Sequence, residues 1–145
     1  MNDKWDRRFL RLAAHVAEWS KDPSTKVGCI LVDDDRRVIA TGYNGFPRGV
    51  TDTRERYMDR EMKLQLVVHA EANALLSATV PTAEATAYLT HPPCSSCTKL
   101  LIQAGIARVV FPPPTEEMLA RWGCDFQASG LMLHEANVYV DEVHP

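Results

Sequence analysis

The sequence predicts an α/β protein in which helices cover both faces of a mixed β-sheet, and three observations support this. Two β-rich segments near the start of the chain are separated by a polar turn. After residue 68 the pattern alternates between helical and β-rich segments. The 145 residues, 46% hydrophobic and 24% charged, fit one globular domain with a single core. We therefore expect one three-layer α/β/α domain over residues 1–145.

The first half of the chain is expected to form a helix, a hairpin and a loop. Apolar residues at helical spacing predict an amphipathic helix over residues 3–19, which Asp22-Pro23 ends. The β-rich segments Val27–Val32 and Val38–Tyr43 predict a hairpin, because the residues between them are polar. Glycine and proline mark residues 44–53 as a loop.

The second half is expected to alternate helices and strands. The elements predicted first are a helix over 70–78, a strand over 85–90, a helix over 95–103 and a strand over 107–111. Three prolines then break the chain, and Thr115 can cap a short helix that ends near Trp122. Cys124 is expected in a Gly-Cys-Asp turn, before a last helical face over 126–136 and a strand over 137–141.

The charge distribution favours a small substrate over nucleic acid. The formal net charge is −3, whereas proteins that bind nucleic acid usually carry a basic patch. Residues 52–63 are rich in arginine, but acidic residues balance the basic ones, which is typical of a solvated surface that pairs its own charges. We therefore expect a small-molecule substrate and no nucleic-acid partner.

The chain is also expected to have no membrane partner. Its apolar runs are far shorter than the ~20 residues that a membrane span needs. The charged start of the chain, with no uninterrupted apolar segment after it, does not resemble a signal peptide. We therefore expect a cytoplasmic protein.

Two short motifs carry the chemistry, His69-Ala70-Glu71 and Pro93-Cys94-Ser95-Ser96-Cys97. Catalytic zinc sites use three protein ligands and keep a fourth position for water. A Cys-x-x-Cys pair in the first turn of a helix places both sulfurs on one side, where the helix dipole favours thiolates. The motifs therefore predict one catalytic Zn²⁺ per chain, held by His69, Cys94 and Cys97.

Glu71 is the predicted catalytic residue. A carboxylate beside the open position of the zinc can move protons while the activated water attacks an amine-bearing carbon. Glu71 would give a proton first to the neighbouring ring nitrogen and then to the leaving ammonia. The two motifs together are typical of zinc enzymes that remove amino groups from nucleobases.

Two other interpretations of the motifs stay open. The zinc could be structural, with a fourth ligand from His91, Cys124 or Cys29. The Cys-x-x-Cys pair could instead be redox-active, which would leave the histidine and the glutamate without a role. In the catalytic interpretation, Cys29 and Cys124 are free thiols that serve as small apolar residues.

Four stretches between Asp22 and Val110 form a recognisable set. They are Asp22-Pro23-Ser24-Thr25-Lys26-Val27-Gly28, Thr41-Gly42-Tyr43-Asn44-Gly45, His69-Ala70-Glu71-Ala72-Asn73-Ala74, and the run from Thr90-His91-Pro92-Pro93-Cys94 to Gln103-Ala104-Gly105-Ile106. This set resembles the zinc-dependent cytidine and deoxycytidylate deaminases. The zinc motifs are shared across many deaminases, whereas the Gly-Tyr-Asn-Gly and Gln-Ala-Gly-Ile pieces resemble the deoxycytidylate (dCMP) deaminases most closely.

The resemblance implies a fold, a reaction and contacts to the sugar and base. The fold would be cytidine-deaminase-like with a five-stranded mixed sheet, and the reaction would convert dCMP to dUMP and ammonia, toward dTTP synthesis. Asn44 would hydrogen-bond the sugar, because its amide both donates and accepts, and His91 would line the base pocket. The alternatives at these positions are an Asn-Gly turn residue and a packed histidine. The backbone of Ala70 and Pro92 would contact the base.

The resemblance also suggests residues for the 5′-phosphate, which needs a cation or several donors. Lys26 and Ser24 match the family's Asp-Pro-Ser region and are the first candidates, and Arg48 in the following loop is the second. Residues of these types are more often surface residues than ligands, so that alternative stays open for each of the three.

Two departures from the family pattern refine these expectations. Residues 44–68 contain no histidine or cysteine, so we expect no second, structural zinc of the kind some members carry. Pro112-Pro113-Pro114-Thr115-Glu116-Glu117 replaces a tyrosine-containing segment that closes over the nucleotide in other members. This replacement affects how the phosphate is recognised, and therefore whether a nucleotide is preferred over a nucleoside.

Other activities and partners stay open. The alternatives are a deaminase of dCTP, of deoxycytidine or cytidine, or of a purine base, then a tRNA adenosine deaminase, and a non-catalytic zinc scaffold. The resemblance further implies a homo-oligomer, with a hexamer favoured, and dCTP and dTTP as effectors at a separate site.

Overall fold

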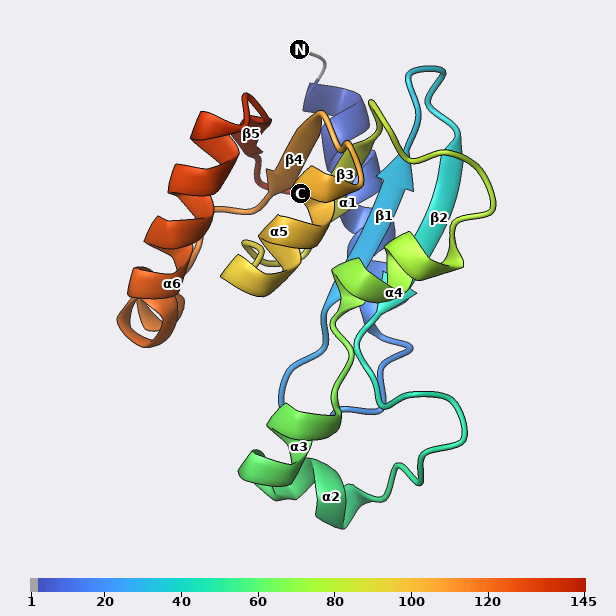
Figure 1. Ribbon diagram of the computed structural model, residues 1–145, viewed down its shortest axis with the longest axis vertical. Coiled ribbons are helices and arrows are strands. Elements are labelled where there is room, and N and C mark those ends of the chain that lie inside the picture. The colour runs from blue at the N-terminus through green and yellow to red at the C-terminus, as the bar shows by residue number, and fades with distance from the viewer. Residues whose placement is uncertain (1–2) are drawn as a thin grey trace.

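The computed structural model describes residues 3–145 as helices packed on both faces of a five-stranded sheet (Figure 1). The helices are α1 (Asp3–Ala17), α2 (Arg54–Met58), α3 (Arg60–Leu66), α4 (Ala70–Ser77), α5 (Ser95–Gln103) and α6 (Glu116–Glu135). The strands are β1 (Gly28–Val32), β2 (Val38–Tyr43), β3 (Thr86–Leu89), β4 (Arg108–Phe111) and β5 (Tyr139–Glu142).

The sheet is mixed, with strand order β2-β1-β3-β4-β5. The hairpin strands β1 and β2 pair antiparallel, and β1 also pairs antiparallel with β3. β3, β4 and β5 then run parallel, as strands joined by crossover helices do. The predicted α/β fold with a five-stranded mixed sheet is confirmed, and the hairpin is found where the sequence predicts it.

Alternate residues of the central strands face two different helical layers. Ile30 and Val32 pack with Tyr88 against α1, whose buried side includes Phe9 and Leu10. Residues of the opposite parity on the same strands join a second core with α4, α5 and α6: Cys29, Leu31, Ala87, Leu89 and Val109. In Figure 1 α1 lies behind the sheet and α4 and α5 lie in front of it. Burial on both faces explains why β1 reads as a continuous apolar run.

Two glycines let the helices approach the sheet at backbone distance. A Cβ atom on Gly28 would lie 2.0 Å from the carbonyl oxygen of Ala13 in α1. A Cβ atom on Gly42 would lie 2.2 Å from the carbonyl oxygen of Ala70 and 2.4 Å from the amide nitrogen of Ala74, both in α4. Gly42 therefore sets the distance between the edge strand β2 and the helix that follows His69.

A buried ion pair joins α1 to strand β4, and through it to β5. Asp6, which is 3% exposed, accepts hydrogen bonds from Arg108 at 2.9 Å and from the Tyr88 hydroxyl at 2.8 Å. Arg108 also donates to Asp141 in β5 at 2.7 Å. Burial by itself would raise the pKa of Asp6, but these hydrogen bonds outweigh it, and the pKa is lowered.

The prediction of two helical segments after residue 115 is wrong. Thr115 caps a helix as predicted, accepting from the amide of Met118 at 3.2 Å, but α6 continues without a break to Glu135. Cys124 lies inside this helix and is exposed, so it occupies neither a turn nor an apolar core. An internal glycine costs a helix only about 1 kcal/mol, and burial of Ser129 and Leu133 against the rest of the domain outweighs that cost.

The prediction that the charges of residues 52–63 pair among themselves is wrong, although the segment is exposed as predicted, apart from Tyr57 and Lys63. The segment contains α2 and α3, capped by the side chains of Thr53 and Asp59. Its ion pairs run to residues outside it: Asp52 pairs with Lys21 at 2.9 Å, and Lys63 pairs with Asp22 at 2.6 Å. The two short helices are therefore attached to the loop that precedes β1.

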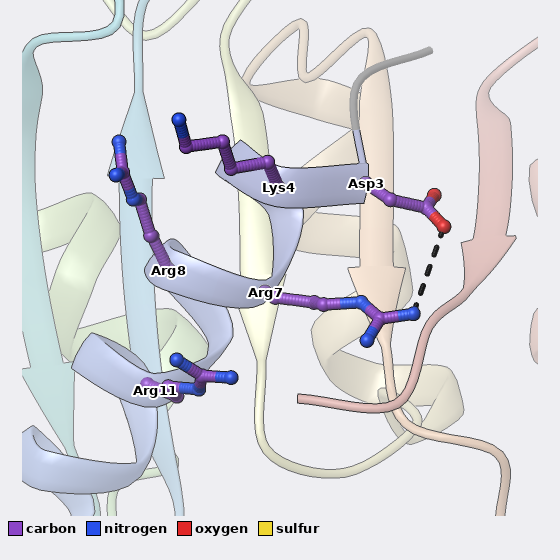
Figure 2. Close-up of a pocket in the computed structure, with 5 residues that line it drawn as sticks. All are labelled: Asp3, Lys4, Arg7, Arg8 and Arg11. Carbon is purple, nitrogen blue, oxygen red and sulfur yellow. Dashed lines mark ion pairs between the residues drawn. The ribbon is translucent and has the colours of Figure 1, made fainter.

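A pocket on the N-terminal half of α1 is lined by four basic residues and one acidic residue (Figure 2). Arg7, Arg8 and Arg11 extend from this face with Lys4, and Arg7 approaches Asp3 at 3.8 Å. Figure 1 places this part of α1 at the end of the molecule away from α2 and α3. Within residues 3–145, no helix has the length and apolar character to cross a bilayer.

Candidate metal centre and active site

The N-termini of α4 and α5 bring the predicted metal ligands together. His69 is the residue that caps α4, and its extended backbone (φ −72°, ψ 155°) directs the chain into the helix. Cys94 occupies the same position before α5, and its sulfur accepts a hydrogen bond from the amide of Cys97 at 3.4 Å. Both helix dipoles therefore place partial positive charge at this point, which favours thiolates.

The donor atoms have the spacing of a tetrahedral zinc site. His69 Nδ1 lies 3.4 Å from Cys94 Sγ and 3.3 Å from Cys97 Sγ. Zn–S bonds of about 2.3 Å and Zn–N bonds of about 2.0 Å at a tetrahedral centre would place such atoms about 3.5 Å apart. Two thiolates and an imidazole are a donor set that suits zinc. The residues therefore fit the ion, with Nδ1 as the histidine ligand atom.

The protonation of the three side chains is coupled. Hydrogen bonding from Cys97 and His69 lowers the pKa of Cys94 to about 4. The hydrogen bond to Cys94, together with burial, raises the pKa of Cys97, and the contact with Cys94 raises the pKa of His69. A divalent cation would displace the protons that the cluster shares, so metal binding is expected to weaken as pH falls.

Glu71 lies beside the metal ligands and is 4% exposed. Burial raises the pKa of its carboxyl group, while its own backbone amide and nearby His69 act in the opposite direction. Glu71 and Cys97 also interact through their side chains. A raised pKa helps a buried carboxyl to hold a proton in transit between two groups, as an acid/base catalyst must.

No fourth protein ligand joins the cluster among the described residues. Within residues 3–145, His69, Cys94 and Cys97 are the only histidine, cysteine or acidic side chains whose donor atoms group closely enough for one ion. Cys29 lies in the core on β1, and Cys124 is exposed on α6. This arrangement leaves one coordination position for water, as catalytic zinc sites do.

The ring of His91 lies against Thr90 in the loop after β3. Thr90 Oγ1 accepts a hydrogen bond from the amide of Gly28 at 3.0 Å and lies 2.9 Å from His91 Nδ1. One of these two groups donates to the other, either the threonine hydroxyl or an Nδ1–H of the ring. Burial lowers the pKa of His91, so the half-buried ring is neutral at pH 7 and carries one N–H donor.

Asn44 has structural partners for both ends of its amide. Its Oδ1 accepts from the amide of Val27 at 2.8 Å, and its Nδ2 donates to the carbonyl of Thr25 at 2.9 Å and to Asp22 at 3.4 Å. The side chain is buried and holds the 22–27 loop against the end of β2. The predicted sugar contact would have to share these atoms or use the Asn44 backbone.

Asp22 organises the loop that carries two of the phosphate candidates. Its fully buried carboxylate accepts from the amides of Ser24 and Thr25, and Lys63 Nζ lies 2.6 Å from it. Ser24 and Lys26 are exposed on this loop. Among the ion pairs of residues 3–145, none involves Lys26.

The remaining predicted site residues occupy two different environments. Ala70 is fully buried at the first turn of α4, next to His69 and Glu71. Arg48 is exposed in the loop after β2, like the other two phosphate candidates. The structure thus brings the metal ligands and Glu71 together, and it puts the phosphate candidates on exposed loops.

Three residues near the site were not predicted from the sequence. Lys63 contacts Asp22, and Asp125 and Ser129 on α6 hydrogen-bond to the segment around Cys94. Each contact joins residues far apart in the chain, so local spacing carries no signal for it. The Gly-Cys-Asp pattern predicts a turn at Asp125, whereas the residue lies within helix α6.

Zinc enzymes that hydrolyse the amino groups of nucleobases combine a histidine and two cysteines with a nearby glutamate in this way. The chain belongs to the cytidine and deoxycytidylate deaminase family, whose zinc-binding region matches residues 3–112. Both metal motifs lie inside the matched region, whereas α6 and β5 lie outside it. The family resemblance seen in the sequence is confirmed.

Relatives extend the similarity beyond the zinc-binding region. The chain is 41% identical to the uncharacterized deaminase in the luxG 3′ region of Aliivibrio fischeri, over 97% of this chain and 94% of that protein. It is 39% identical to a probable deoxycytidylate deaminase of Caenorhabditis elegans, over 97% and 70% of the two chains. The human deoxycytidylate deaminase is 35% identical, over 74% of this chain and 64% of its own length.

Solved structures establish that the fold is shared over the whole chain. The dCMP deaminase of cyanophage S-TIM5, whose structure was determined in complex with dCMP and dUMP, superposes with a TM-score of 0.77. The sequences are 23% identical, and the superposition covers 99% of each chain. The likeness therefore includes α6 and β5.

Proposed function

We propose that this chain catalyses the zinc-dependent hydrolytic deamination of dCMP to dUMP and ammonia. The observation that carries the proposal is the grouping of His69, Cys94 and Cys97 with buried Glu71 beside them. Support for the substrate comes from relatives 35% to 39% identical that are named deoxycytidylate deaminase or probable deoxycytidylate deaminase. The 41% identical relative is named only as a deaminase, so the substrate requires a direct test.

The reaction divides between the ion and the protein. When bound, zinc supplies the Lewis acidity that makes water a nucleophile at neutral pH. Glu71 moves the protons: it takes them in turn from the attacking water and gives one to the ring nitrogen next to the amine-bearing carbon and the next to the departing amino group, which leaves as ammonia. Its burial excludes bulk water from this transfer and raises the pKa of its carboxyl group.

Binding of the pyrimidine requires donors and acceptors around the metal. We assign the amide of Ala70, the carbonyl of Pro92 and the ring of His91 to the base, because they belong to the segments that carry the ligands. A neutral His91 is a hydrogen-bond donor that adds no charge beside a neutral base. Asn44 is assigned to the sugar, by its backbone or by sharing its amide.

The phosphate is assigned to exposed donors on the two loops that Asn44 joins. Ser24 and Lys26 lie on the 22–27 loop, which Asp22 and Asn44 hold in place, and Arg48 follows Asn44. A nucleotide monophosphate needs only one or two cations, so these residues suffice. Charged and hydrogen-bonded contacts of this kind would favour dCMP over the unphosphorylated nucleoside.

One substrate panel tests both the reaction and the phosphate assignment. Ammonia release is compared at equal concentrations of dCMP, deoxycytidine, dCTP, CMP and guanine. The proposal predicts the highest kcat/KM for dCMP. It also predicts that Lys26→Ala mainly raises the KM for dCMP. The exposed residue Lys99 on α5 provides a matched control, Lys99→Ala. Equal rates on dCMP and deoxycytidine would refute the phosphate assignment, and no ammonia from either would refute the substrate.

The assembly and effectors implied by the resemblance are also proposals. We propose a homo-oligomer, with six copies favoured, whose mass can be measured by sedimentation equilibrium. We also propose that dCTP raises and dTTP lowers the rate at subsaturating dCMP, which a titration of each nucleotide would test.

A further inference from the structure

Helix α6 makes direct contact with the segment that carries the first cysteine ligand. Asp125 on α6 accepts two hydrogen bonds from Ser95, one from the backbone amide at 2.8 Å and one from the hydroxyl at 2.6 Å. Ser95 is the first residue of α5 and directly follows Cys94. A carboxylate in this position satisfies an amide that the helix itself leaves without an acceptor.

A second contact fixes the other side of the same cysteine. Ser129, one helical turn after Asp125, is 3% exposed and donates its hydroxyl to the carbonyl of Pro93 at 3.0 Å. Residues four apart lie on one face of a helix, so Asp125 and Ser129 act from the same side of α6. The backbone is thus held immediately before and immediately after Cys94.

We propose that Asp125 and Ser129 are positioning residues that hold the Cys94 thiolate where it binds zinc. The inference rests on the zinc site of the proposed function and is independent of its substrate. Neither residue touches the reacting atoms. Both lie outside the region that the family model matches, so the metal loop of this chain is held by a helix beyond that region.

The geometry explains why such support is needed. Cys94 is half-buried and precedes α5, which holds its carbonyl through the amide of Thr98 at 2.9 Å and its sulfur through a longer hydrogen bond from the amide of Cys97 at 3.4 Å. Cys97, by contrast, is buried within the first turn of α5. Removing a group that orients a metal ligand from outside the coordination shell typically lowers metal affinity by about 10–100-fold.

The test measures zinc affinity in the full chain by competition with a chelator of known affinity. The variants are Asp125→Ala, Ser129→Ala and the conservative Asp125→Asn, with Glu135→Gln as the matched control. Glu135 is an exposed acidic residue at the far end of the same helix. The proposal predicts zinc affinity lowered roughly 10–100-fold in Asp125→Ala, less in Asp125→Asn, which keeps one acceptor for the Ser95 amide, and unchanged in Glu135→Gln.

A spectroscopic measurement separates positioning from a purely structural role. With Co²⁺ in place of Zn²⁺, the thiolate-to-cobalt absorption band reports how both sulfurs meet the metal. The proposal predicts a shifted or weakened band in Asp125→Ala and Ser129→Ala, with recovery in Asp125→Asn. Circular dichroism shows whether each variant is folded. If Asp125→Ala does not fold, the comparison of Ser129→Ala and Asp125→Asn with the wild type decides the question.

The outcomes distinguish this inference from the proposed function. Folded variants with zinc affinity within twofold of the wild type and an unaltered cobalt band would overturn the positioning role while leaving the zinc site intact. Wild-type protein that binds no zinc would overturn both. Failure of dCMP as a substrate would leave the metal affinities, and therefore this inference, unaffected.

Discussion

Replacing Gly42 by alanine should separate β2 from α4 and damage the active site from a distance. The added Cβ would lie 2.2 Å from the Ala70 carbonyl oxygen and 2.4 Å from the Ala74 amide nitrogen. Side-chain carbons essentially never approach other heavy atoms closer than 3.0 Å, and backbone atoms cannot rotate out of the way. α4 must therefore move by about 1 Å, and it carries Glu71 in its first turn.

The expected cost has two parts. Overpacking of this kind typically costs about 1–3 kcal/mol of unfolding free energy. A displacement of about 1 Å at a catalytic group can lower the rate about 100-fold. Urea unfolding of Gly42→Ala gives the first quantity, and kcat/KM for ammonia release gives the second.

Glycines on α6 provide the control for Gly42→Ala. A Cβ atom on Gly123 would meet no atom within 4 Å, and the residue lies inside a helix. Gly123→Ala should therefore be neutral or stabilise the protein by about 0.4–1 kcal/mol, with kcat/KM unchanged. Gly42→Ala with wild-type stability and wild-type kcat/KM would show that α4 is not held at the spacing described.

Three further predictions concern buried polar groups. Lys63→Met should lower the unfolding free energy by about 2 kcal/mol. This is less than the roughly 3–5 kcal/mol lost when a fully buried pair is broken, because Asp22 still accepts hydrogen bonds from other donors. An unchanged urea midpoint would contradict this prediction. Because hydrogen bonds lower the pKa of Asp6, its stabilisation is complete above the unfolded pKa of about 4 and is lost as pH falls below that value. Asp6→Asn should therefore be less stable at neutral pH and flatten the acid limb of a stability–pH curve. Thr98 Oγ1 is buried without a hydrogen-bond partner among the described residues. Thr98→Val should therefore raise the unfolding free energy by about 1 kcal/mol, and with it the thermal midpoint. A lower midpoint would contradict this.

The elements that carry the metal ligands are local, and for that reason the sequence predicts them well. Helix α5 spans the predicted residues, and α4 ends one residue earlier than expected. Their starts are marked by Pro93 and by the change to good helix formers after His69, signals that act within a few residues. The spacing of Cys94 and Cys97 then places both sulfurs together whatever the rest of the fold does.

The errors arose where contacts between distant residues decide the structure. Gly123-Cys124-Asp125 has the composition of a turn, but the burial of Ser129 and the hydrogen bonds of Asp125 to α5 keep α6 continuous. Tertiary packing overrides local propensity in such cases. Thr53 and Asp59 could have revealed α2 and α3, because each has the residue type of a helix cap.

Asn44 shows the limit for binding residues. Its place in a family motif points to a ligand, while its hydrogen bonds to Thr25 and Val27 show a residue that already holds a loop. Sequence spacing can bring a polar group to the site, but only the full set of partners shows which of its atoms are committed.

Glu71→Gln provides the most direct test of the central claim, that three side chains hold zinc with one open position and Glu71 moves the protons beside it. The substitution keeps the size of the side chain and removes its ability to donate and recover a proton. Zinc content and ammonia release are measured on the same purified sample. The account predicts one zinc per chain, as in the wild type, with a rate reduced about 100- to 10,000-fold. A variant that keeps both its zinc and its full rate would contradict it.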